Sequence, residues 1–204
     1  MMGKLKKLTG YRLFLPLSCL IIVLLINLIT TPTFFRITIN NGVLYGYIID
    51  VINRASELVV LAVGMTLVVS ASAGTDISVG AVMAVAAAVC TRVLAGGEVS
   101  VNEYANPYVL AVLAALAAAV VCGGFNGLLV AKLKIQPMVA TLILFTAGRG
   151  ISQLVTNGQI TYIRVDGYKL LGNNIPGIPI PTPIFVAVIV VALTYILLKK
   201  TAMG

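Results

Sequence analysis

The chain has 204 residues, of which 60% are hydrophobic and only 10% charged, and its mean hydropathy is +1.08. A soluble domain carries about 25% charged residues, so this composition excludes that class and predicts an integral membrane protein. The net charge of +8 sits mostly in short clusters beside apolar segments. Membrane orientation requires this pattern, so we expect no nucleic-acid partner.

Reactive side chains are few. The chain has no histidine, and its three cysteines (Cys19, Cys90 and Cys122) all lie in apolar segments, as buried thiols do. Paired carboxylates, Ser/Lys pairs, phosphate-binding glycine loops and metal-ligand spacings are not discernible. We therefore expect no catalytic residues, no metal site and no cofactor. Any ATP hydrolysis that drives this protein is expected in a separate chain.

Apolar runs of about 20 residues predict an all-α bundle that forms a single transmembrane domain over 1–204. The first run has a basic flank but no small-residue cleavage site, so we interpret it as a retained span and not a signal peptide. Six spans are expected, over residues 12–30, 57–74, 77–95, 108–131, 137–155 and 183–198.

Three polar segments separate these spans on one side. Apolar and polar residues around 48–54 predict a short helix at the membrane interface within the segment 31–56. Residues 96–107 form a short loop. The longer loop 156–182 contains several prolines, which predict an irregular and stiff conformation.

Basic residues near the ends of the spans predict the orientation. With the N-terminus in the cytoplasm, eight Lys and Arg residues lie inside and four outside. The inside set is Lys4, Lys6, Lys7, Arg12, Lys132, Lys134, Lys199 and Lys200; the outside set is Arg36, Arg54, Arg164 and Lys169. An even number of spans then places the C-terminus inside as well.

Small residues on shared helix faces indicate that the spans pack together. Gly123 and Gly127 form a small-xxx-small pair, and Gly80 begins a row of small residues at four-residue spacing. Gly148 and Gly150 flank Arg149 and allow close contact there. Because backbones approach closely at such positions, we expect a multi-helix bundle and not an isolated anchor.

The apolar tract from 58 to 95 is long enough for two spans and is interrupted by Thr75, Asp76 and Ser78. Asp76 either lies in a surface turn and caps the following helix through nearby amides, or lines a polar cavity. The two roles are compatible. The depth of this break in the bilayer, as a surface turn or as a discontinuous helix, stays open.

Three further polar residues lie inside predicted spans. Asn126, about 9 Å into the bilayer, either bonds a neighbouring helix or lines a polar path. Arg149, roughly 20 Å along the fifth span, shares a face with Gln153, four residues later. A guanidinium at that depth is either a clamp between helices or a group that faces a pathway.

Two blocks of sequence resemble a known family. Gly64-Met65-Thr66-Leu67-Val68-Val69 with Asp76-Ile77-Ser78-Val79-Gly80 is similar to a signature of the permease subunits of bacterial monosaccharide ABC importers, the ribose/xylose/arabinose/galactofuranose group. The second block contains Asn126-Gly127, Lys134-Ile135-Gln136-Pro137, Val139-Ala140-Thr141-Leu142 and Gly148-Arg149-Gly150. The sequence of residues 49–55 and 158–160 resembles that of the galactofuranose-type permeases.

The chain departs from the family pattern at two positions and at its end. Ala73 and Thr75 stand where the family usually has a glycine and an isoleucine, so the break loses backbone freedom and gains a hydroxyl. In the family, the segment after Lys200 continues into a cytoplasmic loop that docks on the ATPase and into further spans. The resemblance therefore implies the N-terminal portion of a permease, truncated in the gene or in the record.

The resemblance implies a permease subunit that moves a monosaccharide across the bacterial inner membrane by alternating access. Implied partners are a second permease subunit, a cytoplasmic ABC ATPase, a periplasmic sugar-binding protein and membrane lipid. The proposed pathway or gating residues are Thr75, Asp76, Ser78, Asn126, Arg149 and Gln153. Alternatives are a non-transporting fragment that only associates with other permease subunits, and a small secondary carrier. The residues do not identify the sugar.

Overall fold

A computed structural model describes residues 14–31, 33–40, 43–165, 167–168, 172 and 178–200. Six helices in this part of the chain follow the apolar runs: α2 (Phe14–Thr30), α3 (Tyr47–Ser72), α4 (Val79–Ala95), α5 (Tyr108–Ala131), α6 (Pro137–Val155) and α7 (Thr182–Lys200). α3, α5, α6 and α7 are long and apolar enough to cross a membrane, whereas α2 and α4 have 17 residues each. The fold is an all-α membrane bundle.

The helix ends follow local signals. α5 and α6 cover the same residues as two of the predicted spans, and Pro137 at the first position of α6 suits a helix start because it needs no backbone donor there. α4 ends at Gly96, which has φ 59°, a left-handed conformation that favours glycine. The basic residues before Leu13, used above for orientation, lie outside the described residues, as does Lys169.

One prediction about the second span is wrong. The segment around 48–54 is not a separate interfacial helix but the first two turns of α3, which runs unbroken over 26 residues. No proline or glycine interrupts it before Gly64, and its inner residues Ile52, Ser56 and Val59 form one stripe against α7. Packing against α7 therefore extends the helix through the polar residues of this segment.

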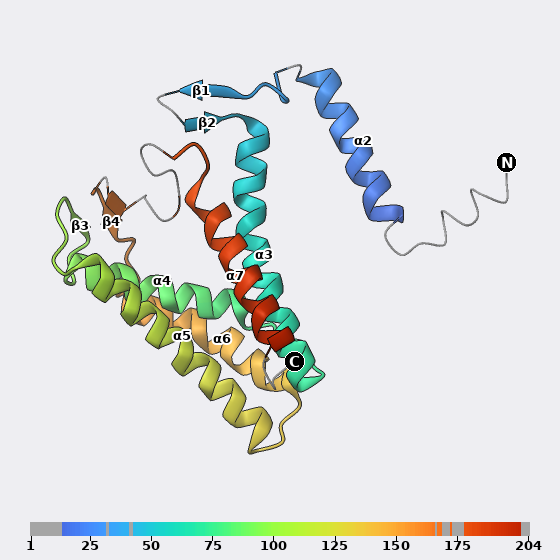
Figure 1. Cartoon of the computed structure of the whole chain (residues 1–204). Helices are drawn as coiled ribbons and strands as arrows, with labels where there is room; N and C mark the ends of the chain where they lie inside the picture. Colours follow the sequence, from blue (N-terminus) through green and yellow to red (C-terminus); the bar gives the residue numbers. More distant parts are fainter. Residues whose placement is uncertain are drawn as a thin grey trace, which may run out of the picture.

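Short strands join the loops at one end of the molecule. β1 (Thr38–Asn40) pairs antiparallel with β2 (Val43–Tyr45), and β3 (Ser100–Val101) pairs parallel with β4 (Tyr162–Ile163). The Leu44 amide donates to the Pro179 carbonyl at 3.0 Å, which connects the hairpin to the segment before α7. The two strand pairs lie apart in Figure 1, β1–β2 at the top and β3–β4 at the left, so the loops are joined in pairs: the second to the third through β3–β4, and the first to Pro179.

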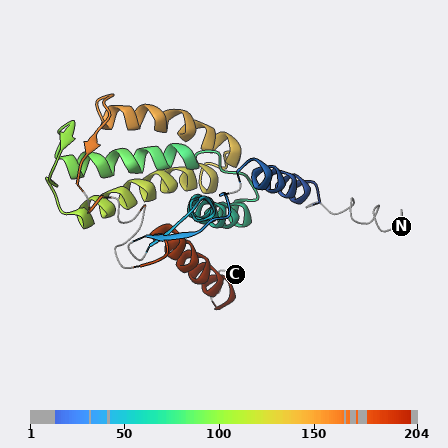
Figure 2. The same ribbon diagram turned by 90° about the horizontal axis from the view of Figure 1, so that it is seen from above.

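The helices form two packed groups. α4 lies between α5 and α6, and α3 packs along α7. Figures 1 and 2 show the first group crossing the second at a large angle, while α2 stands apart in both views. The small core between α4, α5 and α6 contains Val85, Cys122 and Leu144. Large apolar side chains elsewhere are exposed, with none of α2 buried, because their solvent is the lipid.

Candidate transport cavity

The break between α3 and α4 begins where Ala73 adopts a left-handed conformation, φ 52°. Its amide still donates to the Val69 carbonyl at 2.9 Å, which closes α3. Gly74 follows, and a Cβ added there would lie 2.5 Å from Cβ of Pro137 and 2.7 Å from its Cγ. The chain therefore leaves α3 directly against the first residue of α6, and only glycine fits at this contact.

Asp76 holds the start of α4. Its Oδ1 accepts hydrogen bonds from the Ser78 amide at 2.7 Å and from the Ser78 hydroxyl at 2.6 Å. The Ser78 amide is one of the donors that a helix start leaves without a backbone partner. Asp76 thus makes the capping contact considered above, through the residue just before Val79.

Asn126 of α5 joins this arrangement from the side. Its Nδ2 donates to the Ser78 hydroxyl at 2.9 Å, so Asp76, Ser78 and Asn126 form one continuous hydrogen-bonded chain. Ser78 is fully buried and Asn126 is 7% exposed. The Oδ1 of Asn126 has no hydrogen-bond partner among the residues that the structure describes, and an unmet buried acceptor costs about 1–3 kcal/mol.

α6 supports the break from the other side. Thr141 is buried, and its hydroxyl accepts a hydrogen bond from the Ile77 amide at 3.3 Å while donating to the Met138 carbonyl at 3.2 Å. The non-helical residues between α3 and α4 are therefore held by side chains of both α5 and α6. Irregular backbone at membrane depth is tolerated only where protein or a polar cavity satisfies it in this way.

A cavity of about 520 Å³ opens beside the break. Its walls come from the end of α3, the break, the last half of α5 and the start of α6, and they include Ser72, Thr75, Asp76, Asn126, Lys134 and Thr141. Lys134 has φ 57°, a left-handed conformation uncommon for a residue with a side chain. Polar groups converging on a largely apolar cavity are typical of ligand sites.

The cavity unites several residues that the sequence analysis named separately. Thr75, Asp76, Asn126, Gly123 and Gly127 line it, with Ser78 buried behind Asp76. Thr141 and Lys134 were not proposed as site residues. A polar side chain four residues after Pro137, at the same end of the bundle as Asn126, was the signal that could have identified Thr141.

Arg149 and Gln153 lie elsewhere. The Arg149 guanidinium is exposed and lies 4.7 Å from the ring centroid of Phe145, one turn earlier on α6. Gln153 lines a separate hollow of about 280 Å³ between α4 and α6, at the end of the molecule that carries the strands. Thr91, Ser152 and Thr156 line the same hollow. The structure does not bring these two residues to the break.

The five glycines proposed for helix packing differ in their surroundings. At Gly148 an added Cβ would lie 3.0 Å from Cβ of Ala81, so α6 and α4 approach closely there. At Gly80, Gly123, Gly127 and Gly150 no atom of the described residues beyond the adjoining residues and nearby backbone of the same helix lies within 4 Å of an added Cβ. Gly123 and Gly127 instead leave room in the cavity wall.

The opposite end carries two partly buried tyrosines, Tyr104 and Tyr168, in its loops. The Tyr104 hydroxyl is buried and has no hydrogen-bond partner among the described residues. Burial raises the pKa of Tyr104 and, together with the nearby Cys90 and Tyr104, that of Tyr168. Both phenols are therefore uncharged at neutral pH. In the described part of the chain, no group of three or more acidic, cysteine or histidine side chains could hold a metal ion.

Comparison with known proteins identifies the family. The profile described as "Branched-chain amino acid transport system / permease component" matches residues 47–204. The chain belongs to this permease family. Because this family consists of transport permease subunits and several helices are apolar enough to cross a membrane, the chain is a multi-pass membrane protein.

Individual relatives are sugar permeases by name. The chain is 43% identical to the galactofuranose transporter permease protein YtfT of Escherichia coli, over 92% of its own length and 52% of the relative's. It is 36% identical to the fructose import permease protein FruF of Bifidobacterium longum, over 98% of its own length and 55% of the relative's. It is 32% identical to the ribose import permease protein RbsC of E. coli, over 92% of its own length and 54% of the relative's. The chain spans about half the length of these relatives. No solved structure matches it.

Proposed function

We propose that the chain is a membrane-spanning permease subunit of an ATP-binding-cassette importer that moves a monosaccharide across the bacterial inner membrane. Three relatives named for galactofuranose, fructose and ribose support a sugar over an amino acid, although the family description mentions branched-chain amino acids. The observation that carries the proposal is the polar cavity at the break, which the family signature itself builds through Asp76, Ser78 and Asn126.

The cavity is suited to a sugar in size and chemistry. Its volume of about 520 Å³ lies in the range of about 300–1,000 Å³ that small ligands occupy. The Asp76 carboxylate is an acceptor for hydroxyl donors, and the hydroxyls of Ser72 and Thr75 add further polar contacts. We assign Asp76 and Asn126 to the pathway or its gate, with Thr75 and Ser78 in support.

The hydrogen-bonded chain at the break also suggests how the gate moves. Asn126 of α5 bonds Ser78 and Thr141 of α6 bonds Ile77, both directly before α4, which packs against both helices. We infer that these three helices move together while α3 pivots at residues 73–75. Alternating access by one group of helices rocking against another needs such a pivot. Arg149 and Gln153 are proposed to act nearer the outer end, where the hollow around Gln153 lies.

The assembly follows from the same proposal. A second permease subunit completes the pathway, a cytoplasmic ABC ATPase hydrolyses ATP, and a periplasmic sugar-binding protein delivers the sugar to the strand-bearing end. The N-terminus is cytoplasmic, and so is the end that carries the cavity. Two features support this orientation: Lys132 and Lys134 follow α5, and Lys199 and Lys200 end α7.

A chimera tests the function directly. This chain replaces the matching half of the E. coli galactofuranose permease, and uptake of labelled sugar is measured in cells that contain the relative's ATPase and binding protein. We expect uptake that Asp76→Asn or Asn126→Leu lowers by about tenfold or more. The first replacement weakens the charge-assisted bonds to Ser78, and the second removes the donor to the Ser78 hydroxyl. Asn102→Ala, in an exposed outer loop, is the matched control.

The outcomes separate the alternatives. A chimera that is present in the membrane and binds the ATPase but takes up no sugar supports the non-transporting fragment. Uptake that persists without the ATPase and follows an ion gradient supports a secondary carrier. Arg149→Met in the same chimera tests the outer gate, and unchanged uptake would remove Arg149 from the pathway.

A further inference from the structure

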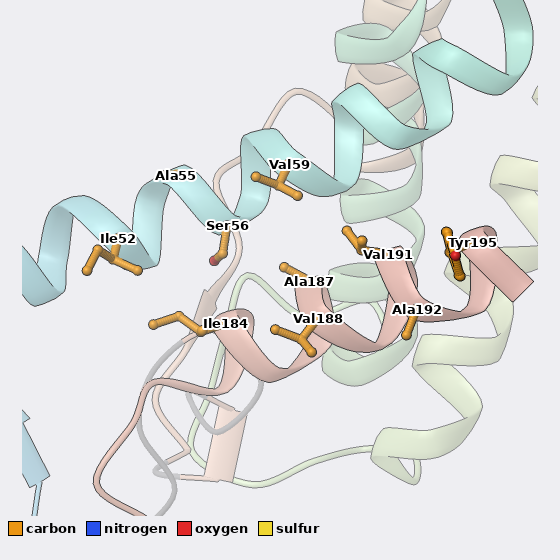
Figure 3. Close-up of a pocket in the computed structure, with 10 residues that line it drawn as sticks. All are labelled: Ile52, Ala55, Ser56, Val59, Ile184, Ala187, Val188, Val191, Ala192 and Tyr195. Carbon is orange, nitrogen blue, oxygen red and sulfur yellow. The ribbon is translucent and has the colours of Figure 1, made fainter. Parts of the chain in front are cut away.

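Two hollows outside the cavity at the break differ in their chemistry. The hollow between α3 and α7, about 540 Å³, is lined mainly by apolar side chains such as Ile52, Val59 and Val191 (Figure 3). The hollow between α4 and α6, about 280 Å³, has six polar residues among the ten that line it. We call this space the α4–α6 hollow, and its polar residues are Thr91, Ser152, Gln153, Thr156, Gln159 and Thr161.

Small residues of α4 leave room for the α4–α6 hollow. The α4 wall consists of residues spaced three and four apart, which share one face of the helix: Ala84, Ala87, Ala88 and Thr91. From the first to the last of these the face spans about 10 Å. The end of α6 and the residues between α6 and β4 form the rest of the wall. The hollow therefore runs inward from the end of the molecule that carries β3 and β4.

Among the described residues, no charged side chain lines the α4–α6 hollow. Arg92, next to Thr91, donates to the Gly97 carbonyl at 2.8 Å, and the Arg149 guanidinium lies over the ring of Phe145. A charged group that leaves water needs a partner of opposite charge and hydrogen bonds. The lining therefore favours a neutral ligand over a zwitterionic amino acid.

Three hydroxyls in the hollow already donate their protons, each to a carbonyl of its own helix. Thr91 donates to Ala87 at 3.0 Å, Ser152 to Arg149 at 2.8 Å, and Thr156 to Ser152 at 3.1 Å. A hydroxyl that has donated keeps its lone pairs as acceptors. A ligand that pairs with these three oxygens must therefore bring donors of its own.

Gln153 and Gln159 supply groups of both kinds. Neither carboxamide, nor the Thr161 hydroxyl, bonds another residue that the structure describes. A carboxamide donates and accepts, as the hydroxyl of a ligand does. The volume of about 280 Å³ is just below the range of about 300–1,000 Å³ typical of small-ligand sites. Neutral donors and acceptors in a space of this size suit a single sugar ring.

We propose that the α4–α6 hollow is a receiving site that binds one neutral monosaccharide through its hydroxyls, with Gln153 and Gln159 as the main hydrogen-bonding side chains. The inference rests on the function proposed above and names the ligand of its outer site. From Ser78 to Thr91 the chain rises about 20 Å. The receiving site and the cavity at the break therefore lie toward opposite ends of α4.

Tryptophan fluorescence tests the site without background from native tryptophan, because the chain contains none. Ile160→Trp places a probe in the wall of the hollow, at an exposed position. Leu154→Trp places a control probe at the end of α6, also exposed, where the side chain does not line the hollow. The full chain in detergent micelles is titrated with D-ribose, D-fructose and D-galactose, and with L-leucine as the zwitterionic comparison.

We expect at least one sugar to change the emission of the Ile160→Trp variant saturably at roughly millimolar concentration, as a few neutral hydrogen bonds give. L-leucine should have no effect, and neither should any sugar on the Leu154→Trp variant. Adding Gln153→Met, which keeps the length of the side chain but removes its amide, should raise the half-saturating concentration about fivefold.

Two threonines provide a matched pair of further replacements. Thr91→Val in the Ile160→Trp background should weaken binding, because it removes an acceptor from the hollow. Thr146→Val should leave binding unchanged. Its hydroxyl also donates to a carbonyl of its own helix at 3.0 Å, that of Leu142, but it does not line the hollow.

Three results would overturn the proposal: no response to any of the three sugars, an equal response to L-leucine, or an equal response of the two probes. Uptake by the chimera gives a second measurement if the Ile160→Trp variant does not fold. Gln153→Met should raise the KM for sugar uptake there, and an unchanged KM would also count against the site.

The receiving site and the transport function fail separately. Asp76→Asn, at the other end of α4, should leave the fluorescence response unchanged. A response that Gln153→Met weakens, in a chain whose chimera takes up no sugar, would support the receiving site and contradict transport. A chimera that takes up sugar while the probe in the hollow gives no response would overturn the receiving site alone.

Discussion

Ala73 adopts a backbone conformation that its side chain disfavours. Its φ of 52° lies in the left-handed region, where a Cβ crowds the following carbonyl oxygen. Glycine adopts this conformation without that penalty and is the usual residue after the last helical turn. The alanine therefore makes the end of α3 stiffer and less stable than a glycine would.

Ala73→Gly should therefore stabilise the protein by about 1 kcal/mol, because removal of the Cβ relieves the left-handed strain. The midpoint of thermal unfolding, followed by circular dichroism in detergent micelles, measures the change. Ala71→Gly is the matched control, because Ala71 lies within the last turn of α3, where glycine costs about 1 kcal/mol. A lower midpoint for Ala73→Gly would contradict the conformation assigned to the break.

Single polar residues could be identified from the sequence, but their hydrogen-bond partners could not. Asp76 and Asn126 stand out because polar groups are costly in an apolar span. Their connection through the Ser78 hydroxyl depends on how α4 and α5 are rotated against each other, which no local pattern specifies. The exposed position of Arg149 over Phe145 likewise depends on which face of α6 packs inward.

At the scale of the helices, the close approach between the α3–α4 break and the start of α6 determines where the cavity lies. Gly74 touches the Pro137 ring, and a proline ring has no side-chain torsion by which it could move away. The start of α6 thus abuts the end of α3 at the point about which α3 is proposed to pivot. The helices themselves were predictable from apolar run length, whereas this contact and the pairing of β3 with β4 arise from residues far apart in the sequence.

Gly74→Ala should lower the free energy of unfolding by about 1–3 kcal/mol, the usual cost of forcing an extra carbon into a packed contact. Gly64→Ala offers a control of opposite sign. Gly64 lies inside α3 with nothing within 4 Å of an added Cβ, so alanine there should stabilise the helix by up to about 1 kcal/mol. If both replacements had the same sign in the same unfolding assay, the contact between Gly74 and Pro137 would be disproved.

Across the whole molecule, successive connections between helices lie at alternate ends, as in a bundle that crosses the membrane repeatedly. The strands and their loops lie at one end, whereas the α3–α4 and α5–α6 connections and the end of α7 lie at the other (Figure 1). The end with the strands was predicted to be outside from the distribution of basic residues alone. Several of those residues lie beyond the described part of the chain, so the orientation rests on Lys132, Lys134, Lys199 and Lys200.

Accessibility of single cysteines tests this orientation. In a chain whose Cys19, Cys90 and Cys122 are replaced by alanine, a cysteine is introduced either at Asn102 or at Lys132, both exposed and on either side of α5. A membrane-impermeant maleimide should label position 102 in intact spheroplasts and position 132 only in inverted vesicles, because Lys132 belongs to the basic cluster expected to remain in the cytoplasm. The reverse pattern would invert the proposed topology. Labelling of both positions from one side would show that α5 does not cross the membrane, and the cavity at its end could not then open to the cytoplasm.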